Sequence, residues 1–190
     1  IMFLASLILY KKLLSNIAPS IKSVSLSYVK NILNIGGAFF FVQIGALILF
    51  QTNNIIIVKI IGPEAVTKFN VAFKYFSIAT MIFTIVVTPY WSAFTDAYAK
   101  HDFEWMKENV KIMRKLWVVL SFVAILLLVF SQTFFNVWIG KQIYIDNYLT
   151  VSMTLFVIVS MWQTLHVYFL NGTGKIRLQL VLVLIGALIN

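Results

Sequence analysis

The sequence predicts an all-α integral membrane protein, a polytopic helical bundle with four complete transmembrane helices and two partial ones. Hydrophobic residues form 61% of the 190-residue chain and charged residues 11%, and the mean hydropathy is +0.94. A soluble domain carries about 25% charged residues. Several apolar runs reach about 20 residues, the length that a helix needs to cross a bilayer. These runs are continuous, whereas the strands of an outer-membrane barrel alternate.

The formal net charge of +9 comes from Lys and Arg that cluster at the ends of the apolar runs. This distribution is typical of membrane proteins, whose cytoplasmic loops are enriched in basic residues. We therefore expect contact with the anionic inner leaflet and no nucleic-acid partner. The absence of cysteine excludes disulfides and thiolate metal sites.

The apolar runs and the charged residues between them predict where each helix and each connecting segment begins and ends. The predicted elements are the end of a transmembrane helix of a first bundle (1–10), a basic amphipathic cytoplasmic connector (11–34), four spans (35–58, 68–90, 116–138 and 148–170), a cytoplasmic amphipathic helix (102–115) and a partial final span (178–190). The last six of these, with their loops, form most of a second bundle (35–190). Because the chain begins and ends inside apolar runs, we expect it to be a fragment of a longer protein.

The basic residues also set the orientation of the spans. The three segments predicted to be cytoplasmic hold eleven Lys and Arg, and the two predicted outer segments hold three. The inner segments are 11–34, 91–115 and 171–177, and the outer ones are 59–68 and 139–147. This alternation agrees with the positive-inside rule.

Local signals predict several helix ends. Gly62 is suited to end one helix and Pro63 to begin the next. Asp102 is a suitable N-cap for the amphipathic helix that follows it. Pro89 is expected to kink or terminate the second complete span.

Polar side chains recur at helical spacing on the first two complete spans. On the first span, Gln43 and Asn54 share a stripe, with Gln51 nearby, and such residues either hold helices together or line a cavity. On the second span the stripe consists of Asn70, Lys74, Ser77, Thr84 and Thr88. A charge inside a span normally faces water or a partner. Lys74 therefore either lines an aqueous cavity or reaches the outer interface.

The remaining segments carry two further candidate features. Ser152, Gln163 and His166 share a face of the last complete span, with Ser160 close by. His166 suits proton coupling, because histidine changes charge near neutral pH, or it serves as a neutral packing residue. In the amphipathic helix, Lys107, Lys111 and Arg114 are expected to contact anionic lipid headgroups.

The residue patterns of several enzyme classes are missing. The sequence has no His/Asp/Glu cluster at metal-binding spacing, no nucleophile elbow and no dinucleotide fingerprint. Its six acidic residues fall in loops or amphipathic segments. We therefore expect no enzymatic activity, no cofactor and no metal site.

Five short motifs, taken in order, resemble the polysaccharide biosynthesis exporters, the O-antigen-type flippases of the multidrug/oligosaccharidyl-lipid/polysaccharide exporter superfamily. The motifs are Gly-Gly-x-Phe-Phe-x-x-Gln-Ile at 36–44, Gln-Thr-Asn-Asn at 51–54, Gly-Pro-Glu-Ala-Val at 62–66, Pro-Tyr-Trp-Ser-Ala-Phe-Thr-Asp-Ala-Tyr at 89–98 and Asn-Gly-Thr-Gly-Lys-Ile-Arg at 171–177. The resemblance covers residues 11–190.

The resemblance implies part of a two-lobed, MATE-like fold with a central cavity, in a multi-pass protein of the bacterial inner membrane. It implies that undecaprenyl-diphosphate-linked oligosaccharide is moved from the inner to the outer leaflet, by rocking of the two lobes. Polysaccharide assembly proteins are the implied partners. Lys74 would attract the diphosphate, and the other polar stripe residues would line the cavity.

Three other functions stay open. A drug or organic-cation antiporter of the same superfamily would need a buried acid, which the missing half would have to supply. An integral membrane polymerase or glycosyltransferase would need catalytic acids in a large loop, and every complete loop here is short. A non-transporting scaffold would not require the polar stripes.

Overall fold

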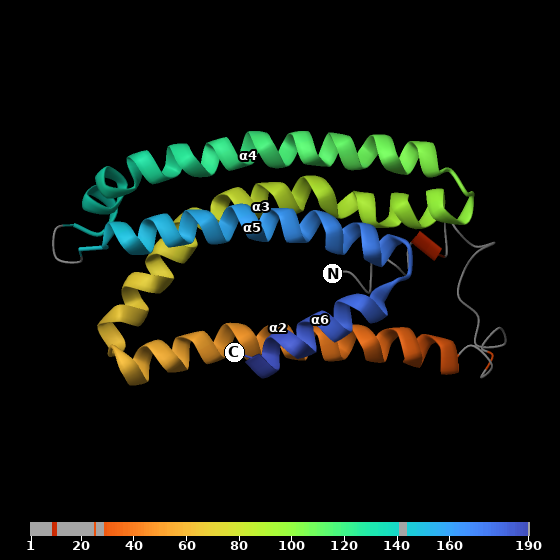
Figure 1. The fold of residues 1–190 in the computed structure, drawn as a ribbon, viewed down its shortest axis with the longest axis horizontal. Coiled ribbons are helices and arrows are strands. Elements are labelled where there is room, and N and C mark those ends of the chain that lie inside the picture. Colours follow the sequence, from red (N-terminus) through yellow and green to blue (C-terminus); the bar gives the residue numbers. More distant parts are fainter. Residues whose placement is uncertain (1–8, 11–24, 26–28, 141–143, 190) are drawn as a thin grey trace. The chain divides into compact units, whose positions relative to one another are not determined.

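The computed structural model describes residues 9–10, 25, 29–140 and 144–189. The chain divides into two compact units, residues 1–38 and 39–190. The helices are α2 (Val29–Ile60), α3 (Pro63–Ala99), α4 (Phe103–Trp138), α5 (Asn147–Gly172) and α6 (Ile176–Ile189) (Figure 1). Within the described ranges the structure contains no strand. The predicted partial helix (1–10) and the connector (11–34) lie mostly outside the described residues.

Helices α3, α4 and α5 pack side by side and form the core of the second unit (Figure 1). Large apolar side chains recur at helical spacing on the inward face of each helix, as an amphipathic packing pattern requires. The largest fully buried side chains include Phe76, Phe83 and Phe94 of α3, Met113 and Phe135 of α4, and Met161 and Leu165 of α5. The outward faces of the same helices carry many exposed apolar side chains, which suits helices surrounded by lipid.

Two polar side chains tie the three helices together. Tyr75 Oη donates a hydrogen bond to Leu127 O at 3.0 Å, which joins α3 to α4. Trp117 Nε1 donates to Ile158 O at 2.9 Å, which joins α4 to α5. Since an unpaired donor is costly in an apolar environment, these bonds fix the relative register of the helices.

Helices α3 and α5 approach each other closely at Gly172. A Cβ atom on this residue would lie 2.5 Å from Phe94 Cβ and 3.1 Å from Trp91 O. Real side chains do not approach so closely, so only glycine allows the two helices to meet here.

The prediction of an all-helical chain with four spans is confirmed at the level of helix length and composition. Residues 39–60 of α2 and the helices α3, α4 and α5 are each long and apolar enough to cross a membrane. The shorter apolar helix α6 begins near the start of the predicted partial span.

Two predicted helix boundaries differ from the structure. Of the two alternatives at Pro89, termination is wrong: helix α3 continues through Pro89 to Ala99, because a proline removes only one backbone donor, and Ser92 Oγ donates to Pro89 O at 3.0 Å. The amphipathic segment 102–115 is not a separate helix but the start of α4. The polarity of the side chains changes near residue 115, but the helical backbone does not.

The predicted start signals of α3 and α4 are confirmed. Gly62 precedes α3 with φ 116°, a conformation that favours glycine, and Pro63 occupies the first turn. Asp102 is the N-cap of α4, and its side chain accepts a hydrogen bond from Trp105 N at 3.1 Å.

We expect Asp102→Ala to lower the free energy of unfolding by about 1 kcal/mol, because the variant leaves a backbone donor of α4 without its cap. Thermal unfolding of the purified protein in detergent measures this change. Asp146→Ala is the matched control, since Asp146 precedes α5 but its side chain makes no capping hydrogen bond. Equal losses in the two variants would contradict the capping role of Asp102.

Candidate functional site

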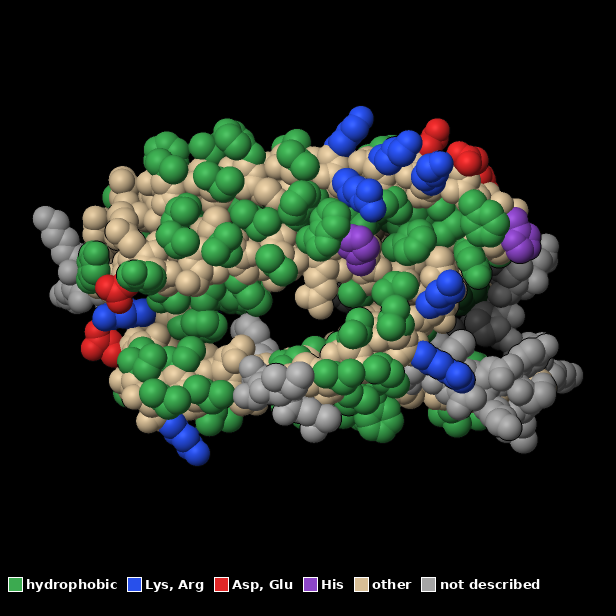
Figure 2. All heavy atoms as spheres, in the orientation of Figure 1, with side chains coloured by type: hydrophobic (Ala, Val, Ile, Leu, Met, Phe, Trp, Pro, Cys, Tyr) green, Lys and Arg blue, Asp and Glu red, His purple; other side chains and the backbone are tan. Residues whose placement is uncertain are grey.

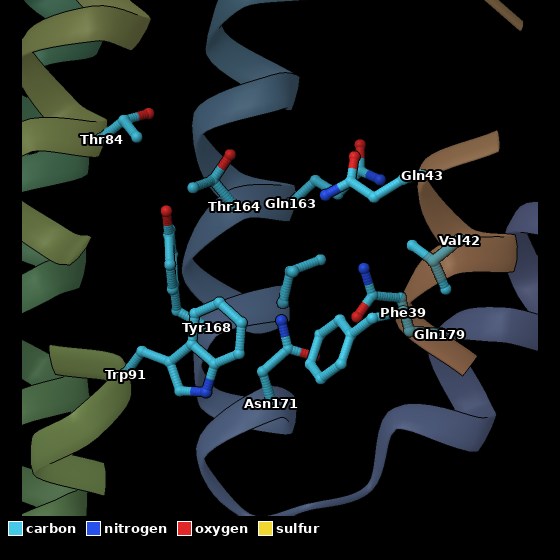
Figure 3. A pocket seen from close by; sticks show the side chains of 11 residues that line it. Phe39, Val42, Gln43, Thr84, Trp91, Gln163, Thr164, Tyr168, Asn171 and Gln179 are labelled. Carbon is cyan, nitrogen blue, oxygen red and sulfur yellow. The ribbon is translucent and has the colours of Figure 1, made fainter. Parts of the chain in front are cut away.

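A pocket of about 320 Å³ lies among α2, α3, α5 and α6, within the second unit (Figure 3). Helix α3 contributes side chains from one wall, α5 from a second, and α2 and α6 from the wall opposite. The described lining residues are Phe39, Val42, Gln43, Thr84, Trp91, Gln163, Thr164, Val167, Tyr168, Asn171 and Gln179.

Aromatic rings form one side of this pocket. The ring centroids of Phe39 and Trp91 are 5.4 Å apart, and those of Trp91 and Tyr168 are 5.9 Å apart. Thr88 Oγ1 and Tyr168 Oη lie 3.2 Å apart and share a hydrogen bond. Trp91 thus connects α2, α3 and α5 and presents a large ring to the pocket.

Side-chain amides form the other side. Those of Gln43 and Gln163 point toward each other across the pocket (Figure 3). Asn171 Oδ1 and Gln179 Oε1 are buried and accept no hydrogen bond in the structure. A buried acceptor without a partner costs about 1–3 kcal/mol. These two oxygens therefore identify the place where a donor from a ligand or from water would be stabilised.

The pocket contains polar groups but no charged ones. Among its described lining residues, none is Asp, Glu, Lys, Arg or His. Amides and hydroxyls both donate and accept hydrogen bonds, and aromatic rings supply apolar faces. This combination suits a neutral ligand rich in hydroxyl groups better than it suits a cation or an anion.

A more open pocket of about 660 Å³ adjoins the first, since Trp91 lines both. Its other described lining residues are Thr88, Ser92, Thr95, Asp96 and Ala99, all on α3. Asp96 is paired with Lys100 at 2.7 Å, one helical turn away. The hydroxyl groups of α3 therefore continue the polar surface toward the end of the helix that is predicted to be cytoplasmic.

The structure brings only one of the six predicted cavity residues, Gln43, into the first pocket. Asn70, Lys74 and Ser77 lie nearer the start of α3 and are not among its lining residues. Ser77 Oγ donates to Lys74 O at 2.9 Å, so this hydroxyl is used within its own helix. The side chain of Lys74 is exposed.

The two remaining predicted residues of α2 also lie outside this pocket. Gln51 is exposed, and Asn54 is half-buried with an Oδ1 atom that has no hydrogen-bond partner. Their neighbour Asn53 lines a separate, mainly apolar pocket of about 310 Å³ with Ser152 and Phe156 of α5.

His166 lies against an aromatic group rather than in the polar pocket. Its Nδ1 donates to Trp162 O at 2.8 Å, and the two rings are 4.6 Å apart. Gln163, which shares its predicted face, does line the pocket. These contacts place His166 against Trp162, and the choice between packing and proton coupling for His166 stays a prediction.

Sequence patterns missed several lining residues. The sequence predicts Asn171 in a turn, but α5 continues to Gly172. Asn171 therefore lies on the same helix face as Gln163 and Val167, which precede it by eight and four residues. Extending the helical spacing of Gln163 by eight residues would have found it. Gln179 lies on α6, where the other polar residue, Arg177, is two positions away and so marks no shared stripe.

Comparison of the chain with protein-family models, with curated proteins and with solved structures finds no match. In the part of the chain that the structure describes, no three His, Asp or Glu side chains lie close enough together to bind a metal ion. The pocket and the sequence motifs are therefore the features of the chain that indicate its function.

Proposed function

We propose that this chain is part of a membrane transporter that moves lipid-linked oligosaccharide from the inner to the outer leaflet of a bacterial inner membrane. The pocket among α2, α3, α5 and α6 would receive the sugar portion as it crosses. Rocking of this bundle against a second one would expose the pocket to each side in turn.

One observation carries this proposal: three separate motifs converge on one pocket. Phe39 and Gln43 come from the motif at 36–44, Trp91 from the motif at 89–98, and Asn171 from the motif at 171–177. These residues are far apart in the sequence, and the resemblance to polysaccharide exporters rests on the same motifs. Helix packing alone does not require residues of three motifs to line the same pocket, whereas a shared binding site does.

The chemistry of the pocket supports a sugar as the ligand. Amide and hydroxyl groups satisfy sugar hydroxyls as donors and acceptors, while the rings of Trp91 and Tyr168 offer flat surfaces for the apolar face of a pyranose. A cationic drug would need an acid in the pocket instead. The adjoining pocket has one acid among its described lining residues, Asp96, and it is already paired with Lys100.

The test uses the full-length gene in its own host. Deletion is expected to leave the lipid-linked oligosaccharide on the cytoplasmic leaflet, and the restored wild-type gene is expected to relieve this accumulation. A gene carrying Trp91→Ala is expected to fail. Normal surface polysaccharide in the deletion strain, with altered sensitivity to cationic drugs, would overturn the proposal and favour an antiporter.

Lys74→Ala is expected to lower transport at least several-fold, and Lys74→Arg to retain most of it. Near the start of α3, Lys68 pairs with Glu64 at 3.0 Å. Lys74 lies six residues beyond Lys68, about 9 Å deeper along the helix. An exposed cation at this depth is stabilised by water or by an anion, and the proposed substrate carries a diphosphate. Transport rates in vesicles check this; equal rates for both variants and the wild type would remove Lys74 from the path.

A further inference from the structure

A groove of about 420 Å³ lies on the first part of α4, beside the end of α5. Phe103, Met106 and Val110 of α4 and Phe169 of α5 form its apolar surface. Lys107, Lys111 and Arg114 line it as well, at spacings that place them on one side of α4. Figure 2 shows Lys and Arg side chains gathered over this part of α4, next to hydrophobic ones.

The three basic groups of this groove are not neutralised by acids. Among the described residues the ion pairs are Lys68–Glu64 and Lys100–Asp96. Glu104 and Glu108 belong to the same helix but are not among the described residues that line the groove. Three unpaired cations beside apolar side chains attract an anion that carries an apolar portion.

Arg114 is held in place by contacts with α5. Its guanidinium lies over the ring of Trp162, with Cζ 5.7 Å from the ring centroid. Trp162 in turn lies 4.9 Å from Trp117, whose Nε1 is hydrogen-bonded to Ile158 O. A guanidinium positioned in this way is preorganised to bind phosphate, which it does with two parallel hydrogen bonds.

The same side of α4 becomes apolar immediately beyond Arg114. At the same helical spacing follow Val118, Phe122, Ile125 and Val129, which are 58%, 61%, 47% and 69% exposed. A stripe that is cationic at one end and apolar for the following four turns matches the length and polarity of a phospholipid. A soluble phosphate compound or a nucleic acid would leave this apolar portion uncovered.

We propose that this groove binds one anionic phospholipid of the inner leaflet. Its phosphate lies between Lys107, Lys111 and Arg114, and its acyl chains lie on the groove and on the exposed apolar stripe of α4. This site is separate from the polar pocket, and the proposal does not depend on what the pocket transports.

The test measures lipid retention by the full-length protein. The protein is purified from nanodiscs of phosphatidylcholine, alone or mixed with phosphatidylglycerol, and native mass spectrometry counts the bound lipids. The triple variant Lys107→Gln, Lys111→Gln, Arg114→Gln is expected to bind phosphatidylglycerol roughly 100-fold more weakly, since each basic group near the membrane surface contributes about five-fold. The control replaces Lys115, Lys175 and Arg177 with Gln, which removes the same charge from the predicted inner side but outside the groove.

Two more variants keep the test decisive. Lys111→Gln alone replaces the triple variant in the test if the triple variant does not fold. It changes one exposed side chain and is expected to weaken binding about five-fold. Arg114→Lys keeps the charge but loses the flat guanidinium over Trp162, and we expect it to weaken binding several-fold.

Three results would overturn the proposal. If the control variant weakened phosphatidylglycerol binding as much as the groove variant, the lipid would be attracted to the basic surface in general and not to the groove. Unchanged retention of phosphatidylglycerol in the groove variants would show that the groove binds no lipid. Displacement of the lipid by inorganic phosphate at equal concentration would show an anion site with no role for the acyl chains.

Discussion

Gly172→Ala is expected to lower the free energy of unfolding by about 2 kcal/mol and to reduce transport sharply. The added methyl group would lie 2.5 Å from Phe94 Cβ and 3.1 Å from Trp91 O. Neither atom is the end of a flexible side chain, so α3 and α5 must move apart. Forcing extra atoms into a packed contact typically costs about 1–3 kcal/mol, and the separation also displaces Trp91 and Asn171 from the pocket.

Thermal unfolding of the full-length protein in detergent measures the loss. Gly186→Ala is the matched control: Gly186 also lies in a helix, but an added Cβ would meet nothing within 4 Å. Alanine is favoured over glycine inside a helix by about 0.5–1 kcal/mol, so the control is expected to be as stable as the wild type or more stable. An unfolding temperature of Gly172→Ala at or above that of the wild type would show that α3 and α5 do not meet at this residue.

Asn171→Leu is expected to leave the protein as stable as the wild type, or about 1 kcal/mol more stable, while transport falls by about ten-fold or more. Asn171 is buried, and its Oδ1 has no partner. Leucine has a similar shape and removes the cost of that unpaired acceptor. It also leaves a hydroxyl of the ligand without its partner, which lowers the affinity of the pocket for a sugar.

The combination of retained stability and lost transport distinguishes a binding residue from a packing residue. Ser121→Ala is the matched control, because Ser121 Oγ is also buried without a partner but lies on α4, outside the pocket. Thermal unfolding and transport into vesicles are measured on the same preparations. Full transport by Asn171→Leu, or an equal loss in the control, would contradict the assignment of the pocket.

The helices were predictable because their signals are local. A long apolar run requires a helix in a membrane, where each backbone group must be satisfied within its own segment. The glycine and proline at 62–63 and the N-cap Asp102 act within one turn of the chain. The wrong helix boundaries at Pro89 and near residue 115 have different causes. At Pro89 the prediction followed the general effect of proline, and near residue 115 it followed side-chain polarity, whereas a helix continues wherever its backbone hydrogen bonds continue.

The pocket was less predictable because its residues come from four helices. A stripe on a single helix indicates which residues share a face, but it does not show what that face meets. The stripe on α2 identifies Gln43, whereas Trp91 stands only in the motif at 89–98 and Gln179 belongs to no pattern in the sequence. The contact between α3 and α5 at Gly172, which places Trp91 near Asn171, is a contact between helices that no pattern within one helix reveals.

The continuity of α4 has a mechanical consequence. Because the basic segment and the span form one helix, Lys107 near its start and Trp138 at its end belong to a single stiff rod and lie about 47 Å apart at 1.5 Å per residue. A tilt at the basic end is therefore transmitted to the other end as a displacement in the opposite direction, with the bilayer acting as the pivot. A helix broken near residue 115 would absorb the same tilt in its hinge and transmit nothing across the membrane.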